Sequence, residues 1–188
     1  MAVNLRVLRL RGVWLLILPF FWYARPTPWS ILLGALPALA GLLLRAWAAG
    51  TIRKERELTT QGPYAFTRSP LYLGSFLLGT GVAVAGGVPL FVVLFFLFFA
   101  GVYGWTIRAE TRELEELFGD AFRAYRTRVP AFLPRLTPYA AGREGSGGGS
   151  SAEPRGFTWK GYLRYREWEA ALGTLAGFAV LVLKWWLT

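Results

Sequence analysis

Residues 88–107 read VPLFVVLFFLFFAGVYGWTI, a run without a single charged side chain. A helix needs about 20 mostly apolar residues to cross the hydrocarbon core of a membrane, and this run is long enough. The whole chain has the same character, because 54% of its 188 residues are hydrophobic and 16% are aromatic. A soluble domain of this length rarely carries so much apolar surface. We therefore predict an all-α integral membrane protein.

Four further apolar runs meet or approach the length of a membrane span, namely residues 8–23, 29–49, 70–86 and 168–187. The run 8–23 is the weakest, because it is short and contains Pro19. A cleaved signal peptide is the rival interpretation, but the bulky sequence Phe-Phe-Trp-Tyr-Ala-Arg-Pro follows where a small-residue cleavage site is needed. The sequence thus predicts a bundle of about five transmembrane helices.

The charges are unevenly distributed along this five-span arrangement. All but three of the 21 basic residues, and all eleven acidic residues, fall on one side of the membrane. The exceptions are Arg25 and Lys184 on the other side and Arg45 within the second span. The positive-inside rule then predicts a cytoplasmic N-terminus and an external C-terminus, as in a prokaryotic inner membrane. The net charge of +10 is read as a topology signal, so no nucleic-acid partner is expected.

The chain contains neither cysteine nor histidine. Disulfides and cysteine-based metal sites are excluded, and the commonest general base and metal ligand is missing. Any chemistry must use carboxylates, arginine, tyrosine, hydroxyl groups or the backbone. We predict no metal site.

Four regions are predicted along the chain. Residues 1–50 would form a transmembrane hairpin, 51–136 a core of two spans and a cytoplasmic helix, 137–156 a flexible Gly/Ser-rich linker, and 157–188 a last span. In the last span, Gly173 and Gly177 have the spacing that permits close helix contact.

A charged segment, 108–125, is predicted to be an amphipathic helix on the cytoplasmic surface. Its apolar residues are spaced by three and four and form one stripe: Leu114, Leu117, Phe118, Ala121, Phe122 and Tyr125. Glu110 falls on this stripe, where a carboxylate is costly unless it is paired or functional. A structural ion pair with Arg68, Arg45 or Arg108 and a functional role are both open.

A second polar element precedes the third span. Gly62-Pro63 indicates a turn, and Ser69-Pro70 fits a helix N-cap followed by proline at the first helical position. The positive end of that helix could receive a carboxylate or phosphate. The alternative is that Ser69 only caps the helix and Arg68 only extends to the interface.

The two segments together carry a recognisable pattern. Its first part is Gly62-Pro-Tyr-x-x-x-Arg-x-Pro-x-Tyr-x-Gly74, and its second is Glu110-x-x-x-Leu-x-x-x-Phe-Gly-x-x-Phe-x-x-Tyr125 followed by Val129-Pro. In order and spacing, residues 51–134 resemble the isoprenylcysteine carboxyl methyltransferase and phospholipid methyltransferase superfamily.

The resemblance implies a helical membrane enzyme that binds S-adenosylmethionine at the cytoplasmic ends of its helices. The cofactor-binding positions would be Arg56, Glu57, Leu58, Thr59, Tyr64, Ser69, Pro70, Leu71, Tyr72 and Glu110. The candidate catalytic residues are Glu110, Arg68 and Arg108, of which the two arginines would hold an anionic head group.

The chain departs from the family pattern at three places. Ser69 stands where most relatives have histidine, Thr106 stands where the isoprenylcysteine branch has a substrate-contacting arginine, and Thr111 interrupts an acidic doublet that starts at Glu110. These departures argue against an isoprenylcysteine substrate. The predicted acceptor is instead a lipid-like molecule that offers a phospholipid amine or the carboxylate of an amphiphile.

Two other functions stay open at this point. Sterol-reductase-like membrane enzymes share a similar Arg-x-Pro-x-Tyr-x-Gly element and use NADPH. A catalytically degenerate relative could serve as a membrane scaffold.

Overall fold

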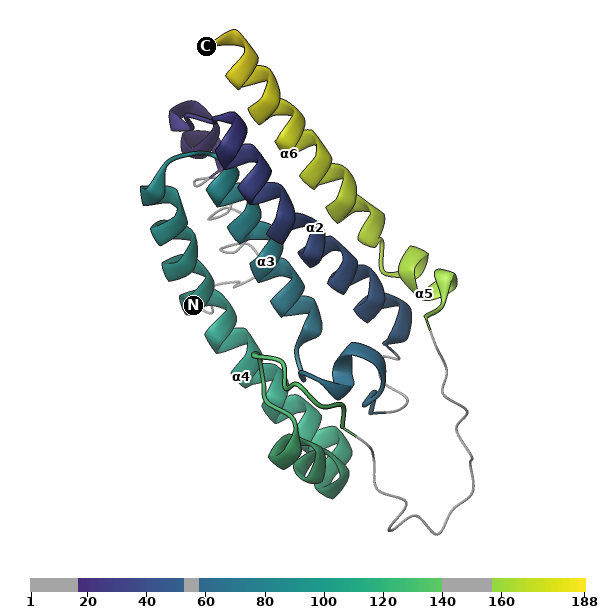
Figure 1. Cartoon of the computed structure of the whole chain (residues 1–188). Helices are drawn as coiled ribbons and strands as arrows, with labels where there is room; N and C mark the ends of the chain where they lie inside the picture. The colour runs from purple at the N-terminus through teal and green to yellow at the C-terminus, as the bar shows by residue number, and fades with distance from the viewer. Residues whose placement is uncertain (1–16, 53–57, 140–156) are drawn as a thin grey trace, which may run out of the picture.

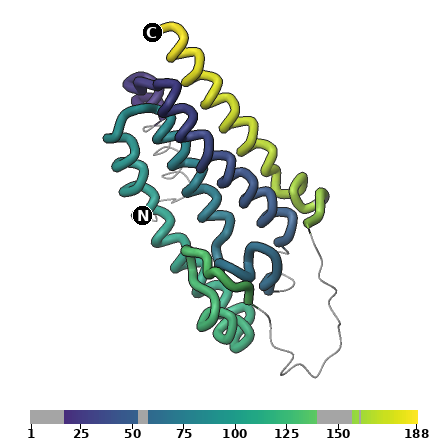
Figure 2. Tube along the Cα trace, in the orientation of Figure 1, coloured from purple at the N-terminus to yellow at the C-terminus, as the bar shows by residue number. Residues whose placement is uncertain are grey.

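This computed structural model describes residues 17–52, 58–139 and 157–188. All regular structure in these residues is helical. After a helical segment at 17–23, the elements are α2 (Pro28–Thr51), the 3₁₀ turn η1 (Gly62–Ala65), α3 (Pro70–Ala85), α4 (Pro89–Arg128), α5 (Trp159–Arg164) and α6 (Glu167–Leu187). The long helices lie side by side as a bundle (Figures 1 and 2). The all-α prediction is confirmed.

Three helices, α2, α4 and α6, are long and apolar enough to cross a membrane. The helix α3 is apolar but has only 16 residues. It packs beside α2 along its length and completes the bundle. Of the predicted first span, 8–23, only residues 17–23 lie within the described part of the chain. The chain is thus an integral membrane protein.

Tryptophans mark the two edges of the apolar band. Trp29 is near the start of α2 and Trp47 near its end, and both side chains are exposed. Eighteen residues of α-helix separate them, which is about 27 Å at the usual rise. The same spacing separates Trp168 from Trp186 on α6. This distance is close to the thickness of a bilayer core, about 30 Å, as expected for aromatic belts.

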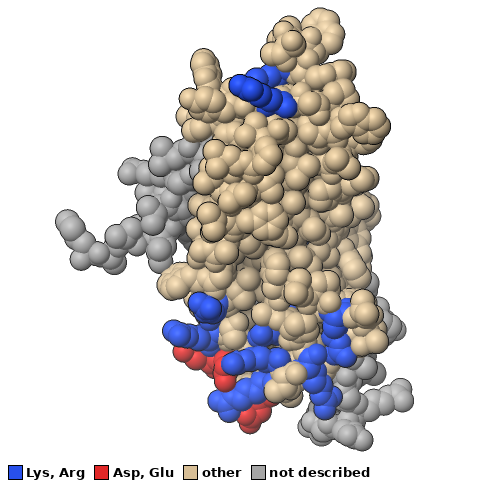
Figure 3. Space-filling model, turned by 60° about the vertical axis from the view of Figure 1, so that its left-hand side comes forward, with Lys and Arg blue, Asp and Glu red and all other residues tan. Residues whose placement is uncertain are grey.

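Charge is concentrated at one end of the bundle (Figure 3). In that view the acidic residues lie only at the lower end, where most of the lysine and arginine side chains also gather, and a small basic patch lies at the opposite end. We call the first end the charged end. The end of α2, η1, the start of α3 and the last part of α4 meet there (Figure 1).

Small residues hold α2 and α3 at very close range. A methyl group added at Gly41 would lie 2.5 Å from the carbonyl oxygen of Gly74, and one added at Gly81 would overlap the backbone of Gly34. This close approach is the seam that small residues at intervals of three and four permit in membrane helices. By contrast, no atom of the described ranges lies within 4 Å of the equivalent position at Gly173. The predicted close contact at the α6 glycines is therefore not formed at that residue.

The predicted fourth span and the predicted surface helix form one continuous helix. The boundary that we expected between residues 107 and 108 is therefore wrong. The helix α4 runs from Pro89 to Arg128 because no glycine or proline interrupts it between Trp105 and Phe118. It bends at Gly119, whose φ of 50° and ψ of −124° are not helical. Glycine reaches this region without the steric penalty of other residues.

Beyond Gly119 the chain turns back on itself and buries Phe122, Tyr125 and Val129. Leu58, Leu114, Phe118 and Tyr139 pack against that cluster. Of the predicted apolar stripe, Leu114, Phe118, Phe122 and Tyr125 belong to this cluster. The stripe is wrong for Leu117, which is 62% exposed, and for Ala121, which is also exposed.

Charged side chains fix α6 at both ends. At the charged end Glu167 pairs with Arg45 of α2. At the other end the ammonium group of Lys184 donates to the carbonyl oxygens of Phe21, at 2.8 Å, and Trp22, at 2.6 Å. These two carbonyls lie at the C-terminal end of a helix, where a cation is favourable.

Candidate functional site

Two segments far apart in sequence are joined by backbone hydrogen bonds at the charged end. The loop that enters α3 and the segment that follows α4 are connected by N–H to carbonyl bonds of 2.9 Å each, from Arg68 to Pro130, Arg135 to Phe66 and Tyr139 to Ala65. Of the predicted linker 137–156, residues 137–139 are described and include this last contact, and 140–156 lie outside the described residues. The α4 tail therefore packs against the loop.

Tyr64, in η1, lies at the centre of this junction and is only 7% exposed. Its carbonyl oxygen accepts a 2.6 Å hydrogen bond from the hydroxyl of Tyr125, but its own buried hydroxyl has no partner within the described residues. Burial raises the pKa of Tyr64 above its ordinary value, and the negative charge of Glu110 raises it further. Tyr64 and Glu110, both predicted site residues, thus lie close enough to interact.

Glu110 itself is exposed, although the stripe predicted a membrane-facing carboxylate. Arg45, one of its three predicted ion-pair partners, pairs with Glu167 instead. Arg108, another of them, is also exposed. The carboxylate of Glu110 therefore lies at the rim of the junction, where both solvent and Tyr64 are near.

Arg68 is held in place rather than extended to the interface. Its guanidinium lies over the ring of Phe122, 5.8 Å from the ring centroid, and its Nε atom is buried without a hydrogen-bond acceptor in the described part of the chain. Burial lowers the pKa of Arg68, and the nearby positive charge of Arg126 lowers it further. A cation with an unused donor in such a position is suited to an anionic or oxygen-rich ligand.

The third span begins at Pro70 as predicted, but the side chain of Ser69 forms no cap hydrogen bond. The backbone N–H of Ser69 donates to the hydroxyl of Thr67, at 3.4 Å, and its φ and ψ of −126° and 56° turn the chain sharply. The first turn of a helix has N–H groups with no intrahelical acceptor, so this end can bind a negatively charged group.

The remaining predicted residues are placed as follows. The side chain of Leu58 packs against the Phe122 cluster, Thr59 is half-buried, and Leu71 accepts a hydrogen bond from Ser75. The ring of Tyr72 meets that of Tyr103 edge-on, with centroids 5.4 Å apart. Arg56 and Glu57 lie outside the described residues. The hydroxyl of Thr106 donates to the carbonyl of Val102 in its own helix, at 2.8 Å.

A cavity of about 560 Å³, which we call the chamber, lies between the helices of the bundle. Residues of 17–23, α2, α3, α4 and α6 line it. Its lining is mostly aliphatic and aromatic, and its polar side chains are Arg45, Ser75, Tyr103 and Thr174. Its volume is typical of a ligand site. Sequence analysis missed the chamber, and the one available signal was a charged residue, Arg45, inside a membrane span.

Arg45 is fixed by three short hydrogen bonds. Its Nε donates to Oε2 of Glu167 at 2.8 Å and its Nη2 donates to Oε1 at 3.0 Å, so the pair is bidentate. Its Nη1 donates to the hydroxyl of Ser75 at 2.5 Å. Glu167 is 8% exposed. A charged group is therefore held rigidly at one side of an otherwise apolar space.

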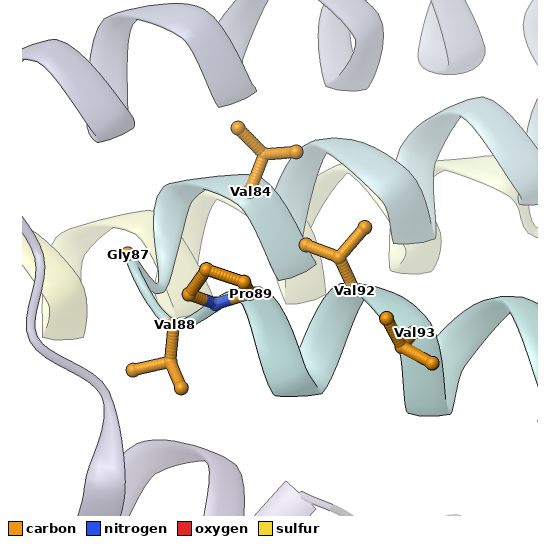
Figure 4. A pocket seen from close by; sticks show the side chains of 6 residues that line it. All are labelled: Val84, Gly87, Val88, Pro89, Val92 and Val93. Carbon is orange, nitrogen blue, oxygen red and sulfur yellow. The ribbon is translucent and has the colours of Figure 1, made fainter.

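A second, smaller cavity of about 370 Å³ lies at the other end of the bundle, beside the α3–α4 turn (Figure 4). It is lined by Val84, Gly87, Val88, Pro89, Val92 and Val93. None of these side chains can donate or accept a hydrogen bond. This cavity offers no group for recognition or chemistry, so the chamber and the charged end form the candidate site.

Comparison with known proteins supplies independent information. The family model for phospholipid methyltransferases matches residues 30–121. The cobalt-zinc-cadmium resistance protein CzcN of Cupriavidus metallidurans is 36% identical over 143 residues, which cover 68% of this chain and 65% of that protein. The nickel-cobalt-cadmium resistance protein NccN of Alcaligenes xylosoxydans xylosoxydans is 40% identical over 110 residues, or 56% of this chain and 49% of that protein.

A eukaryotic enzyme also matches. The protein-S-isoprenylcysteine O-methyltransferase of Schizosaccharomyces pombe is 33% identical over 83 residues, which cover 44% of this chain and 35% of that enzyme. The chain therefore spans between about one third and two thirds of the lengths of these relatives. No solved structure matches the chain significantly.

Proposed function

We propose, from the premise that the chain belongs to the isoprenylcysteine carboxyl methyltransferase and phospholipid methyltransferase superfamily, that it transfers a methyl group from S-adenosylmethionine to a lipid-like acceptor in the membrane. One observation carries the proposal for this chain. A polar junction that contains Tyr64 and Arg68 lies at the charged end of the bundle, and an apolar chamber between the helices has Ser75, in the second turn of α3, in its lining.

The residues of the junction fit S-adenosylmethionine. The buried hydroxyl of Tyr64 and the buried Nε of Arg68 have no partner among the described residues, and buried polar groups in proteins are nearly always paired. The carboxylate of the methionine part suits Arg68 and the first turn of α3. The cationic and hydroxyl-bearing parts suit the carboxylate of Glu110. The sulfonium supplies an already activated methyl group.

The chain's own task is then to position the reactants and exclude water. Ser75, which lines the chamber, follows Ser69 by six residues of α3, or about 9 Å of helix. An acceptor in the chamber therefore has its polar end close to the junction. A carboxylate acceptor needs no base, whereas an amine must lose a proton, for which Glu110 and Glu113 are the candidate carboxylates.

We further infer that any role in metal resistance shared with CzcN and NccN is indirect. Cobalt, nickel, zinc and cadmium prefer imidazole or thiolate ligands, and this chain has neither histidine nor cysteine. Within the described ranges no three acidic side chains gather as a metal site. Methylation of a membrane component would act on the membrane rather than on the ion.

Ligand binding tests the donor assignment. Purified protein in lipid nanodiscs is titrated with S-adenosylhomocysteine by calorimetry. We expect Glu110→Gln to weaken binding about tenfold, because one charge-assisted hydrogen bond is lost. Glu116→Gln is the matched control, since Glu116 is exposed on the same helix and the substitution removes the same charge. Equal effects of the two variants, or no binding by the wild type, would contradict the assignment.

Turnover is tested in cells grown with methyl-labelled methionine. Mass spectrometry compares lipids from cells with and without the protein, and we expect a labelled lipid that depends on the protein. If NADPH but not S-adenosylhomocysteine stabilises the protein against thermal unfolding, the protein is a reductase and the methyltransferase proposal is wrong. If Glu110→Gln retains the full cellular function, the protein is a membrane scaffold and not an enzyme.

A further inference from the structure

Of the described residues that line the chamber, one is charged, Arg45, and its charge is already balanced. A guanidinium group has five N–H donors. Within the described residues three of them are used, two by Glu167 and one by Ser75. One N–H on Nη1 and one on Nη2 are left. They can donate to oxygen atoms of a ligand.

The charge balance decides which ligand can use these donors. Arg45 and Glu167 together carry no net charge, and both are largely withdrawn from water, with 22% and 8% of their side chains exposed. An anionic head group beside Arg45 would also lie close to the Glu167 carboxylate and leave the site with one uncompensated negative charge. Burial of such a charge is costly in an apolar surrounding. A cationic head group would likewise leave the site with one uncompensated positive charge.

The rest of the lining indicates which kind of group the other end of the ligand carries. The chamber contains aromatic side chains such as Phe20, Phe91 and Phe95, and its α6 wall contributes Gly173 and Gly177. Among the described residues nothing within 4 Å would meet a Cβ added at Gly173, so this wall leaves room rather than filling it. The space suits a hydrocarbon chain. Its polar end would lie beside Arg45 and Ser75.

We propose that the chamber binds an amphiphile whose head group carries no net charge and offers a carbonyl or hydroxyl oxygen to Arg45, and that Glu167 sets this preference by neutralising the arginine. Arg45 and Glu167 are thus specificity-determining residues. The inference rests on the proposed function only in regarding this amphiphile as the methyl acceptor.

The test uses three probes with the same chain and different fixed charge: tetradecanol, tetradecanesulfonate and tetradecyltrimethylammonium. Binding of each radiolabelled probe to the full chain in nanodiscs is measured, with binding to empty nanodiscs subtracted. We expect the wild type to bind tetradecanol at least tenfold more tightly than either ion. Gly173→Trp should abolish the binding because it fills the chamber, whereas Gly101→Trp should not, since no atom lies near that position on α4.

Glu167→Gln should remove most of the preference, with sulfonate binding about tenfold tighter than in the wild type, because Arg45 would then be unbalanced. Glu169→Gln is the control, since Glu169 pairs with Arg166 at the exposed start of α6 and the substitution removes the same charge. Wild-type protein that binds sulfonate as tightly as tetradecanol would overturn the proposal even if Glu167→Gln fails to fold. An unchanged preference in folded Glu167→Gln would also overturn it. S-adenosylhomocysteine titration of the same samples separates this result from failure of the proposed function.

Discussion

Tyr64 and Tyr125 are buried phenols that differ in one respect, namely what their hydroxyl groups contact. The Tyr125 hydroxyl donates to the Tyr64 carbonyl, and the Tyr64 hydroxyl has no partner in the described chain. Tyr125→Phe should therefore lower the free energy of unfolding by about 1–3 kcal/mol, because it leaves a buried carbonyl unsatisfied. Tyr64→Phe should leave it unchanged or raise it slightly. Thermal unfolding followed by tryptophan fluorescence compares the two.

The same pair separates structure from ligand binding. If the Tyr64 hydroxyl is a ligand contact, Tyr64→Phe should weaken S-adenosylhomocysteine binding about two- to tenfold, the value of one neutral hydrogen bond. A Tyr64→Phe protein that is as strongly destabilised as Tyr125→Phe would show that this hydroxyl has a partner within the fold.

The raised pKa of Tyr64 also predicts that the protein loses stability at alkaline pH. Burial and the charge of Glu110 raise its pKa above the ordinary value of 10.0. In the unfolded chain the phenol ionises near that ordinary value, while in the folded protein it stays neutral. The stability due to this group is therefore complete below about pH 10 and decreases as pH rises further. Tyr64→Phe should lose less thermal stability than the wild type between pH 9 and pH 11. Parallel curves for the two proteins would exclude this assignment.

At the scale of elements, the seam between α2 and α3 tolerates no side chain. A Cβ at Gly41 would lie 2.5 Å from the Gly74 carbonyl oxygen and 2.6 Å from the Leu78 nitrogen, both of which are rigid backbone atoms. We expect Gly41→Leu to lower the free energy of unfolding by about 3 kcal/mol or more, because the helices must move apart. Gly101→Leu is the control, and it should change stability little because no atom in the described part of the chain lies within 4 Å of a Cβ at that site. Similar thermal midpoints for the two variants would show that α2 and α3 do not pack this closely at Gly41.

The bend at Gly119 is a different kind of glycine requirement. No described atom lies within 4 Å of a Cβ built there, so space is not limiting. Its φ of 50° and ψ of −124° are nevertheless unfavourable for any other residue. Gly119→Ala and Gly119→Leu should therefore both cost about 1–3 kcal/mol, independent of side-chain size. Both should also weaken S-adenosylhomocysteine binding, because Phe122 and Tyr125 would move away from Arg68 and Tyr64. A cost that increased from alanine to leucine would indicate crowding instead.

These elements show which parts of the fold the sequence could predict. Proline at the first helical position located the start of α3, and hydropathy located α2, α6 and the apolar part of α4. The continuity of α4 to Gly119 was not predicted. A charged amphipathic segment and a transmembrane helix have the same backbone, so only a glycine or proline marks a break between them. The bend depends on the ψ of one glycine, which no local pattern specifies.

The candidate site was predictable only in part for a related reason. The motif around Tyr64 and Glu110 is local in sequence, and the structure places the two residues close enough for the Glu110 charge to raise the pKa of Tyr64. The Arg45–Glu167 pair joins residues 122 positions apart and depends on how α6 docks. The chamber likewise results from packing five segments. Glycine spacing in α6 predicted a helix contact, whereas Gly173 provides open space.

At the scale of the whole molecule, charge distribution predicts orientation. The end that contains η1 and the α4 tail carries most of the charged residues, whereas Lys184 lies near the other end of the bundle (Figures 1 and 3). From the positive-inside rule we predict that the charged end faces the cytoplasm, where S-adenosylmethionine would be available. The orientation and the proposed donor site are thus mutually consistent, and each would be weakened by failure of the other.

The absence of cysteine makes this orientation directly testable. Leu136, which is 99% exposed at the charged end, and Thr188, at the end of α6, are each replaced by cysteine. In spheroplasts that express the protein, a membrane-impermeant maleimide should label Thr188→Cys and should label Leu136→Cys only after permeabilisation. The unsubstituted chain is the control, since it has no thiol and should not be labelled in either condition. The reverse pattern would place the Tyr64–Arg68 junction outside the cell, away from S-adenosylmethionine, and the donor assignment could not stand.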